Sequence, residues 1–442
     1  MSSWVRVVKV SHVLPAPATG SPEPALPDDH LVRLSSIDCF VGVMPLQRFF
    51  FNEGPGVPPF PSLVRSLESS LATVLATFLP LAGKLTYRPS AGDLVVDCSP
   101  GRSLTGREAE YAGSMADVHR LAAGDENDPE TLMRLGPMLN ATHLPAPVLA
   151  VQVTRPAAGD GGVVVGVSVH HAVADGHSVW QFMRAWAAAS SGDGMPSPSF
   201  DRAAIWHPKS MELARRFLHT MASSLPMRRR SFTLRADQIE SVKQRILAQS
   251  KAIGEQLEKH PSTYVAVSSL VWTSIVRAMP RPDHAADNDD EACYFGVPID
   301  CRRHLSPPSY VGQGYFGNCL TLRLATAPAS DLACADTGLA RAAAAIRDAV
   351  LANLEDPLRD AEGWPELLRG VPMERLTPTG SSNRFMAYET DFGWGAPTRV
   401  ELVSPCAWEK MLLLGAPDGA VQVTMALDHA HMEGFAAMFL QV

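Results

Sequence analysis

Two kinds of apolar pattern recur along the chain, and together they predict a mixture of strands and helices. Residues 163–169 form a valine-rich run, which is typical of a buried strand. Residues 62–78 instead carry apolar side chains three and four positions apart, which places them on one face of a helix. Similar patterns predict strands at 1–15, 94–96, 149–154, 291–297, 320–324, 399–403, 410–414 and 421–427, and helices at 179–189, 235–249, 262–279, 333–354 and 432–440.

Length and loop composition predict two domains. At 442 residues the chain exceeds the size at which a single hydrophobic core stops growing. Strands and helices occur on both sides of a Gly- and Pro-rich stretch that begins near residue 192, so each half is expected to follow a mixed α/β (α+β) two-layer plan. We predict an N-terminal domain at 1–195, a linker at 196–225 and a C-terminal domain at 226–442.

Composition narrows the possible partners and the location. The formal net charge is −8, and the Arg triplet at 228–230, interpreted as a solvated turn, is too short to suggest nucleic-acid binding. Seven scattered cysteines indicate reduced thiols rather than a disulfide framework. The N-terminus lacks the apolar core of a signal peptide, and no apolar run approaches the length of a membrane span. We expect a cytoplasmic protein without nucleic-acid or membrane partners.

The valine-rich strand ends at the chain's most informative residues. His170 and His171 follow it, and Asp175 and Gly176 then precede the next predicted helix. An imidazole at the end of a buried strand can be held still and still reach a substrate, and its ordinary pKa of about 6.5 lets it exchange a proton near neutrality. Asp175 could orient His171 as in a nucleophile triad, or pair with an arginine and fix the loop. The alternative for His171 itself is a purely structural histidine.

The sequence gives less support to a metal site, a nucleotide-binding site or a serine nucleophile. His170, His171, Asp175 and His177 are crowded enough to suggest a metal, but structural zinc usually needs Cys pairs and no CxxC occurs, so no metal site is predicted. Residues 312–317 match GxGxxG, yet no predicted strand precedes them and no helix follows, which excludes a dinucleotide site. Neither a phosphate-binding GxxxxGK[ST] loop nor a GxSxG nucleophile elbow is present.

Taken together, the motifs resemble those of the BAHD acyltransferases, a plant family of CoA-dependent acyl-transfer enzymes. The family's HxxxDG signature corresponds to His171, Asp175 and Gly176, and its DFGWG signature stands intact at 391–395. The Tyr-Phe-Gly-Asn-Cys segment at 315–319 is typical of the branch that acylates sugars of anthocyanins and other flavonoid or phenolic glycosides. Blocks at 66–85, 262–272 and 300–302 also agree with the family's pattern.

The resemblance implies a monomer of two chloramphenicol-acetyltransferase-like domains with an active-site channel between them. His171 would be the general base that deprotonates the acceptor hydroxyl, and no covalent acyl-enzyme would form because the acceptor itself attacks the thioester. Asp175 would point away from the reacting groups and pair with an arginine, for which Arg302 is the matching residue.

The resemblance also implies roles for residues later in the chain. The CoA-binding candidates are Lys259, Ser262, Asp300 and Arg302; the oxyanion or substrate candidates are Ser381, Ser382 and Asn383; the structural motif residues are Asp391, Gly393, Trp394 and Gly395. The chain departs from the family at His304, where members commonly carry an arginine.

We therefore expect an acyltransferase that moves a malonyl group from malonyl-CoA to a sugar hydroxyl of a flavonoid, anthocyanin or phenolic glycoside, with acyl-CoA as co-substrate and no tightly bound cofactor. The alternatives are a hydroxycinnamoyl-CoA donor, an amine acceptor, a condensation-type domain, and a catalytically silent relative that only binds ligands. A malonyl carboxylate would need a cation, for which Arg184 and His177 are candidates; an aromatic acyl group would need an apolar slot, which Phe40, Phe49 or Phe385 could line.

Overall fold

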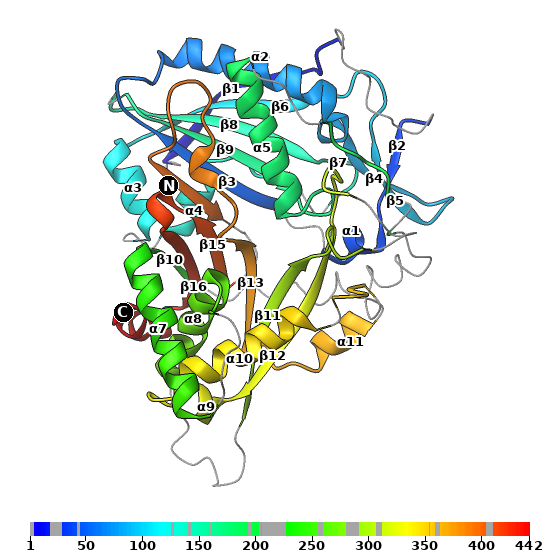
Figure 1. The fold of residues 1–442 in the computed structure, drawn as a ribbon. Helices are drawn as coiled ribbons and strands as arrows, with labels where there is room; N and C mark the ends of the chain where they lie inside the picture. The colour runs from blue at the N-terminus through cyan, green and yellow to red at the C-terminus, as the bar shows by residue number, and fades with distance from the viewer. Residues whose placement is uncertain are drawn as a thin grey trace. The chain divides into compact units, whose positions relative to one another are not determined.

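The structure is a computed structural model, and it divides the chain into two compact units (Figure 1). Unit 1 comprises Met1–Ala222, Leu305–Leu320 and Met386–Cys406, and unit 2 comprises Ser223–His304, Thr321–Phe385 and Ala407–Val442. The described residues are 4–17, 29–41, 45–124, 128–139, 143–159, 161–192, 197–202, 205, 227–254, 260–279, 291–305, 312–352, 354–358, 363–403 and 410–442.

Unit 1 is built on a six-stranded sheet with the strand order β1-β6-β8-β9-β3-β14. The central strand β9 (Val163–His170) is buried at every position, as its unbroken apolar pattern predicts, because both faces of the sheet are covered. The other strands are β1 (Val5–Val13), β6 (Leu104–Tyr111), β8 (Leu149–Pro156), β3 (Pro45–Asn52) and β14 (Arg399–Val403).

Helices cover both faces of this sheet. Helices α2 (Phe60–Thr77) and α5 (Gly176–Ser191) lie across one face (Figure 1), and the indole N–H of Trp186 on α5 donates to Ser70 Oγ on α2 at 3.0 Å. Side chains of α3 (Met115–Ala123) and α4 (Pro129–Arg134) share a buried apolar cluster with Phe49 and Phe51 of β3 on the other face. The end of β9 is thereby held in a rigid core.

Unit 1 also contains a smaller sheet with the order β2-β5-β4-β7. Its strands are β2 (Leu31–Arg33), β5 (Asp93–Asp97), β4 (Lys84–Arg88) and β7 (Ala146–Pro147). The short helix α1 (Ser36–Val41) follows β2, and a 3-10 turn at Leu79–Ala82 joins α2 to β4. These elements bring the segment around Asp38 into the unit's buried interior.

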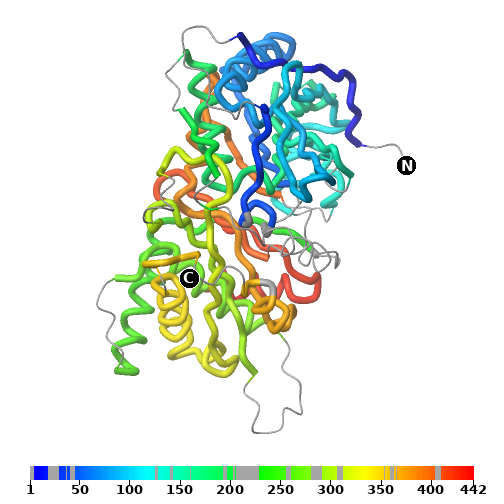
Figure 2. Tube along the Cα trace, turned by 90° about the vertical axis from the view of Figure 1, so that its right-hand side faces the viewer, coloured from blue at the N-terminus to red at the C-terminus, as the bar shows by residue number. Residues whose placement is uncertain are grey.

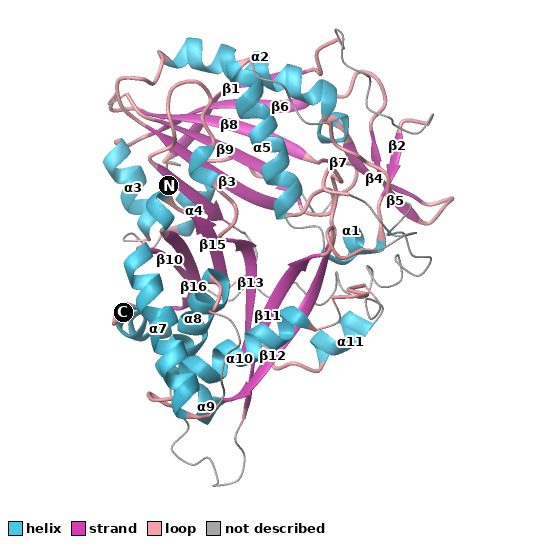
Figure 3. Cartoon of the chain, in the orientation of Figure 1, coloured by secondary structure: helices cyan, strands magenta, loops and turns pink. Residues whose placement is uncertain are grey.

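Unit 2 repeats the plan of a helix-covered sheet (Figure 3). Its strand order is β10-β16-β15-β13-β11-β12, in which β13 pairs in parallel with both β11 and β15. Its core joins sheet residues such as Phe295 and Leu413 to helix residues such as Trp272, Ile346 and Phe435. The strands are β10 (Met227–Leu234), β16 (Val421–Asp428), β15 (Met411–Gly415), β13 (Leu376–Ser382), β11 (Ala292–Asp300) and β12 (Leu320–Pro328); the helices are α7 (Ala236–Ala252), α8 (Thr263–Ala278), α9 (Ala329–Ala333), α10 (Gly338–Leu351), α11 (Trp364–Arg369) and α12 (His429–Phe439).

The predicted mixed α/β class is confirmed, but the two units are discontinuous in sequence, unlike the predicted domains. Strand β14 pairs antiparallel with β3, with Arg399 opposite Phe51 and Val403 opposite Gln47. This pairing places the motif at 391–395 in unit 1 rather than in the predicted C-terminal domain; residues near 400 are orange in the trace of Figure 2. Most of the predicted linker at 196–225 lies outside the described residues.

Two local predictions were wrong. The Arg triplet at 228–230 is part of strand β10 rather than a turn, and Arg228 pairs with Glu433 at 2.7 Å. The helix predicted at 333–354 is shorter in the structure, where α10 spans Gly338–Leu351, because a turn at 335–337 separates α10 from the preceding α9. In the described ranges, no helix combines the length and the apolar character that crossing a bilayer requires.

Candidate active site

The structure separates the roles of the two adjacent histidines. His170, the last residue of β9, is fully buried, and this burial, with a smaller contribution from His171, lowers the pKa of His170 to about 4. His171 is the first residue beyond the strand and is half-buried. Its Nδ1 atom is buried and has no hydrogen-bond partner within the described part of the chain. His170 is therefore a neutral core residue, and His171 is the histidine that solvent or a substrate can reach.

The carboxylate of Asp175 is occupied by backbone N–H groups. Its Oδ1 atom accepts from Ser178 N at 2.9 Å, which caps the N-terminus of α5, and its Oδ2 atom accepts from Cys319 N at 3.0 Å. Asp175 does not reach Nδ1 of His171, so the geometry favours the loop-fixing alternative over the triad. The pairing of Asp175 with Arg302 joins residues of different units and stays a prediction.

The Tyr-Phe-Gly-Asn-Cys segment at 315–319 lies against the loop that carries His171. Gly317 N donates to Ser178 Oγ at 3.0 Å, and that hydroxyl donates in turn to the Gly317 carbonyl at 2.9 Å. The side chain of Asn318 donates to the His171 carbonyl at 2.8 Å. Glycine is required at 317, because a Cβ atom there would lie 2.6 Å from the Tyr315 hydroxyl. The segment thus fixes both the loop and the start of α5.

The motif at 391–395 forms a tight loop within unit 1. One carboxylate oxygen of Asp391 accepts the backbone N–H groups of Gly393, Trp394 and Gly395 at 2.7, 3.1 and 2.9 Å. Phe392 is buried, and its ring packs edge-on against those of Phe50 and Trp186, with centroids 6.3 and 4.9 Å away. Gly393 and Gly395 have φ angles of 96° and 100°, which glycine adopts readily. These contacts agree with a structural role for the motif.

Three of the four CoA-binding candidates have clear local roles in unit 2. Ser262 is exposed, and its Oγ atom accepts from Val265 N at 3.2 Å at the start of α8, which leaves its hydroxyl hydrogen able to donate. Asp300 ends β11 and pairs with the buried guanidinium of Arg302 at 3.1 Å. Lys259 lies outside the described residues.

The three oxyanion candidates differ in what their side chains can donate. Ser381 Oγ donates to the Leu413 carbonyl at 2.6 Å, so its only hydroxyl hydrogen is used, and Ser381 is a poor oxyanion donor. Ser382 Oγ accepts from Arg384 N at 3.2 Å, which leaves its hydrogen for a substrate. Asn383 is half-buried.

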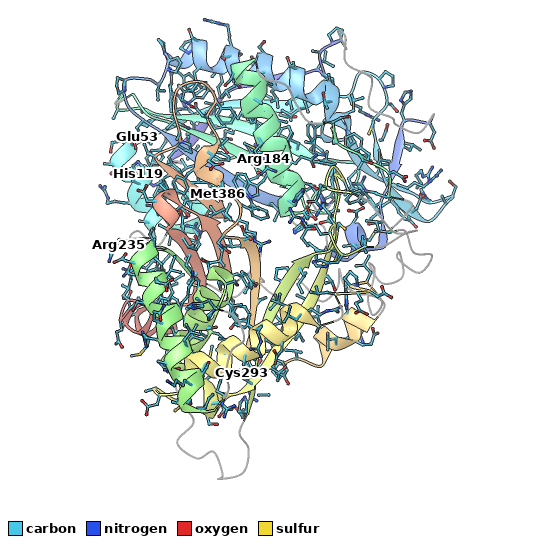
Figure 4. All side chains as sticks on the ribbon, in the orientation of Figure 1. Glu53, His119, Arg184, Arg235, Cys293 and Met386 are labelled. Carbon is cyan, nitrogen blue, oxygen red and sulfur yellow. The ribbon has the colours of Figure 1, made fainter. Side chains whose placement is uncertain are left out.

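The residues suggested for binding the acyl group differ in how accessible their side chains are. Phe49 is fully buried in the core of unit 1, so it cannot line an acyl slot. Phe385 is half-buried, and the side chain of Phe40 lies outside what the structure describes. Arg184 is exposed on α5 (Figure 4), and His177 is half-buried. Among the described residues, no group of His, Cys, Asp or Glu side chains could hold a metal ion.

The fold and the motifs together define an acyltransferase. The family model described as the Transferase family matches residues 21–441, and the chain belongs to this family, that of the BAHD acyltransferases. The structure is similar to that of vinorine synthase, with a TM-score of 0.72 over 97% of this chain and 96% of that one, at 18% identity.

Two relatives of known activity match nearly the whole chain. It is 25% identical over 475 residues to malonyl-coenzyme:anthocyanin 5-O-glucoside-6'''-O-malonyltransferase of Salvia splendens, covering 99% of this chain and 96% of the relative. It is 26% identical over 478 residues to coumaroyl-CoA:anthocyanidin 3-O-glucoside-6''-O-coumaroyltransferase 1 of Arabidopsis thaliana, covering 99% and 97%. The predicted family is thereby confirmed.

Proposed function

We propose that the protein transfers a malonyl group from malonyl-CoA to a sugar hydroxyl of a flavonoid, anthocyanin or phenolic glycoside. The observation that carries the proposal is the half-buried imidazole of His171 at the end of a buried strand. Its loop is fixed by its own Asp175 and by the side chains of Asn318 and Arg202. The malonyltransferase of Salvia splendens supports this choice of donor and acceptor.

His171 has a single nitrogen suited to the chemistry. Because Nδ1 is buried, Nε2 is the atom that accepts the proton of the acceptor hydroxyl. The acceptor oxygen then forms a bond to the thioester carbonyl carbon, and the tetrahedral intermediate collapses with cleavage of the C–S bond. The imidazolium returns its proton to the departing CoA thiolate. No covalent acyl-enzyme forms, since the acceptor is the nucleophile.

Other candidates would bind the CoA donor or stabilise the negative charge that develops on the thioester carbonyl oxygen. An exposed Ser262 hydroxyl can donate to a CoA phosphate or amide, and Ser382 can donate to the oxyanion. Arg184 is the exposed cation of α5 that would pair with the free malonyl carboxylate. Asp175 holds the loop and does not touch the reacting atoms.

A hydroxycinnamoyl-CoA donor is the second candidate, favoured by the similarity to the coumaroyltransferase of Arabidopsis thaliana. An aromatic acyl group would not need Arg184, and Phe385 is the remaining described candidate for an apolar contact. An amine acceptor would use the same base. The family favours an enzyme over the silent ligand-binding alternative.

A donor-by-acceptor matrix tests the proposal. Malonyl-CoA and coumaroyl-CoA are each incubated with flavonoid glucosides, simple phenolic glucosides and amines, and both thiol release and the acylated product are measured. Reactions without acceptor correct for hydrolysis. We expect malonyl-CoA with a glucoside to give the highest kcat/KM, and Arg184→Ala to reduce malonyl transfer more than coumaroyl transfer. Transfer of coumaroyl groups alone would contradict the proposed donor, and transfer to amines alone would contradict the proposed acceptor.

We also propose that the protein works in a reducing compartment such as the cytosol. None of the cysteines in the described ranges is in a disulfide, and burial raises the pKa of both Cys39 and Cys98 to about 12. Unpaired cysteines are typical of proteins in reducing compartments, whereas secreted proteins usually hold theirs in disulfides. Expression of a fluorescent fusion in plant cells, followed by microscopy, tests this proposal: diffuse cytosolic fluorescence supports it, and secretion contradicts it.

A further inference from the structure

A buried carboxylate in unit 1 has no role in the reaction as described above. Asp38, on α1, is fully buried, and its side chain accepts hydrogen bonds from three residues. Its Oδ2 atom accepts from the backbone N–H and the hydroxyl of Ser35, both at 2.9 Å, and from Arg202 Nε at 2.8 Å. Its Oδ1 atom accepts from the backbone and side-chain nitrogens of Asn318, both at 2.9 Å.

One arm of this network ends on His171. The side-chain NH₂ group of Asn318 donates one hydrogen to Asp38 Oδ1 and the other to the His171 carbonyl, at 2.8 Å. Both neighbours of this amide group are acceptors, so the nitrogen, not the oxygen, must face them. Asn318 is completely buried, and the orientation of its amide is therefore fixed by Asp38.

The second arm ends two residues further along the same loop. Arg202, which is almost fully buried, donates from Nε to Asp38 and from Nη2 to the Val173 carbonyl at 3.2 Å. The guanidinium is planar, so the bond to Asp38 fixes the direction in which Nη2 points. The two arms hold the carbonyls of His171 and Val173 from one anchoring carboxylate.

We propose that Asp38, acting through Asn318 and Arg202, is a positioning residue for the imidazole of His171. No side chain in the described ranges orients the ring through Nδ1, so the direction of the ring depends on its own backbone, which Asn318 holds directly. A general base must be held within a fraction of an ångström of its reacting geometry to be effective. This inference deepens the proposed function and rests on His171 being the base.

The energetics favour a positioning role over simple stabilisation. A buried ion pair such as that of Asp38 and Arg202 contributes little net stability, because both charges lose their hydration. Removal of either partner leaves the other charge buried and unpaired, so variants of Asp38 or Arg202 can fail to fold. Asn318 is neutral, and its variants are therefore the sharper test.

The test compares Asn318→Ala with the matched control Gln152→Ala. Gln152 is also a buried amide of unit 1, and it donates to the Arg134 carbonyl at 2.8 Å, not to the His171 loop. We expect both variants to lose a similar amount of thermal stability. Asn318→Ala should lower kcat roughly ten- to hundredfold with little change in KM for donor or acceptor, whereas Gln152→Ala should keep kcat.

A second variant and a parallel measurement keep the test decisive. Asn318→Asp preserves shape but replaces the donating NH₂ group by a carboxylate oxygen, an acceptor that faces two other acceptors. Its kcat should therefore fall at least as far as that of Asn318→Ala. Wild-type kcat in folded Asn318→Ala, or an equal loss in Gln152→Ala, would overturn the positioning role. His171→Ala is assayed beside them: if it keeps full turnover, the proposed function itself fails, whatever the Asn318 variants do.

Discussion

The carboxylate of Asp175 accepts a hydrogen bond from the backbone N–H of Cys319 at 3.0 Å, although the two residues lie 144 positions apart. The other oxygen of the same carboxylate caps α5. A residue of the HxxxDG motif is thereby tied to a residue of the Tyr-Phe-Gly-Asn-Cys segment. Both motifs build one loop, which carries His171, the proposed general base.

Replacement of Asp175 should affect stability and loop order before chemistry. Asp175→Asn keeps an oxygen that can cap α5. Asp175→Ala loses the cap, which should lower the free energy of unfolding by about 0.5–2 kcal/mol. It also leaves the buried Cys319 N–H without an acceptor, which should cost about 1–3 kcal/mol more. Melting temperature and turnover should therefore fall further in Asp175→Ala than in Asp175→Asn.

A cap elsewhere in unit 1 provides the control for this prediction. Asp128 caps α4 by accepting from Thr131 N at 2.9 Å, so Asp128→Ala should destabilise the protein while turnover is retained. If Asp175→Asn showed full activity and full stability, neither its second hydrogen bond nor an ion pair with Arg302 would matter.

His170 should make the protein less stable in mild acid. Its pKa is lowered to about 4 in the folded state from 6.5, so between these values the unfolded chain binds more protons than the folded one. Stability therefore falls as the pH falls from 6.5 to 4, by up to about 3 kcal/mol. Chemical denaturation at pH 7 and pH 5 measures this loss, and His170→Gln should reduce it. An unchanged pH dependence in His170→Gln would show that other groups cause it.

The loop at 391–395 should contribute to stability through Phe392. This ring is buried against Phe50 and Trp186, so Phe392→Ala should cost about 3–5 kcal/mol of unfolding free energy. Phe392→Leu fills most of the space and should cost less. Kinetics on the folded fraction should show a nearly unchanged KM for the acceptor in Phe392→Leu. A large loss of turnover in fully folded Phe392→Leu would contradict a structural role.

Alanine variants of Ser381 and Ser382 should differ in kcat. The Ser381 hydroxyl is bound to the Leu413 carbonyl, so Ser381→Ala should change kcat by less than about threefold, well short of the roughly 10²–10³ that an oxyanion donor supplies. Ser382→Ala removes a hydroxyl whose hydrogen is available and should lower kcat with little effect on the melting temperature. Initial rates at saturating donor and acceptor measure both, and the reverse ranking would contradict this assignment.

Local pattern was sufficient to predict the elements that carry the site. The valine run predicted β9, and the apolar pattern predicted a helix at 179–189. Helix α5 begins three residues earlier, at Gly176, because Asp175 caps it. Strand β3 was missed, because Gln47, Arg48 and Asn52 interrupt its apolar pattern although all three are buried. Each of these side chains donates a hydrogen bond to a backbone carbonyl, which hydropathy does not reveal.

Contacts between distant segments could not be read from the sequence. Asp38 and Asn318 lie 280 positions apart, and nothing local to either residue indicates that they meet. The pairing of β14 with β3, which moves residues 391–395 into unit 1, is likewise a long-range event. The motif at 315–319 was recognised as typical of a family branch, yet its contact with His171 required the fold.

The central claim is that His171 removes the proton from the acceptor. The most direct test measures acyl transfer by His171→Ala and His171→Gln, per mole of protein shown to be folded by its thermal melt. Loss of general-base catalysis should lower kcat by about 10²–10⁴-fold while the melting temperature stays close to that of the wild type. If folded His171→Ala keeps turnover within about tenfold of wild type, the account is contradicted, because loss of a general base should reduce turnover by more than that.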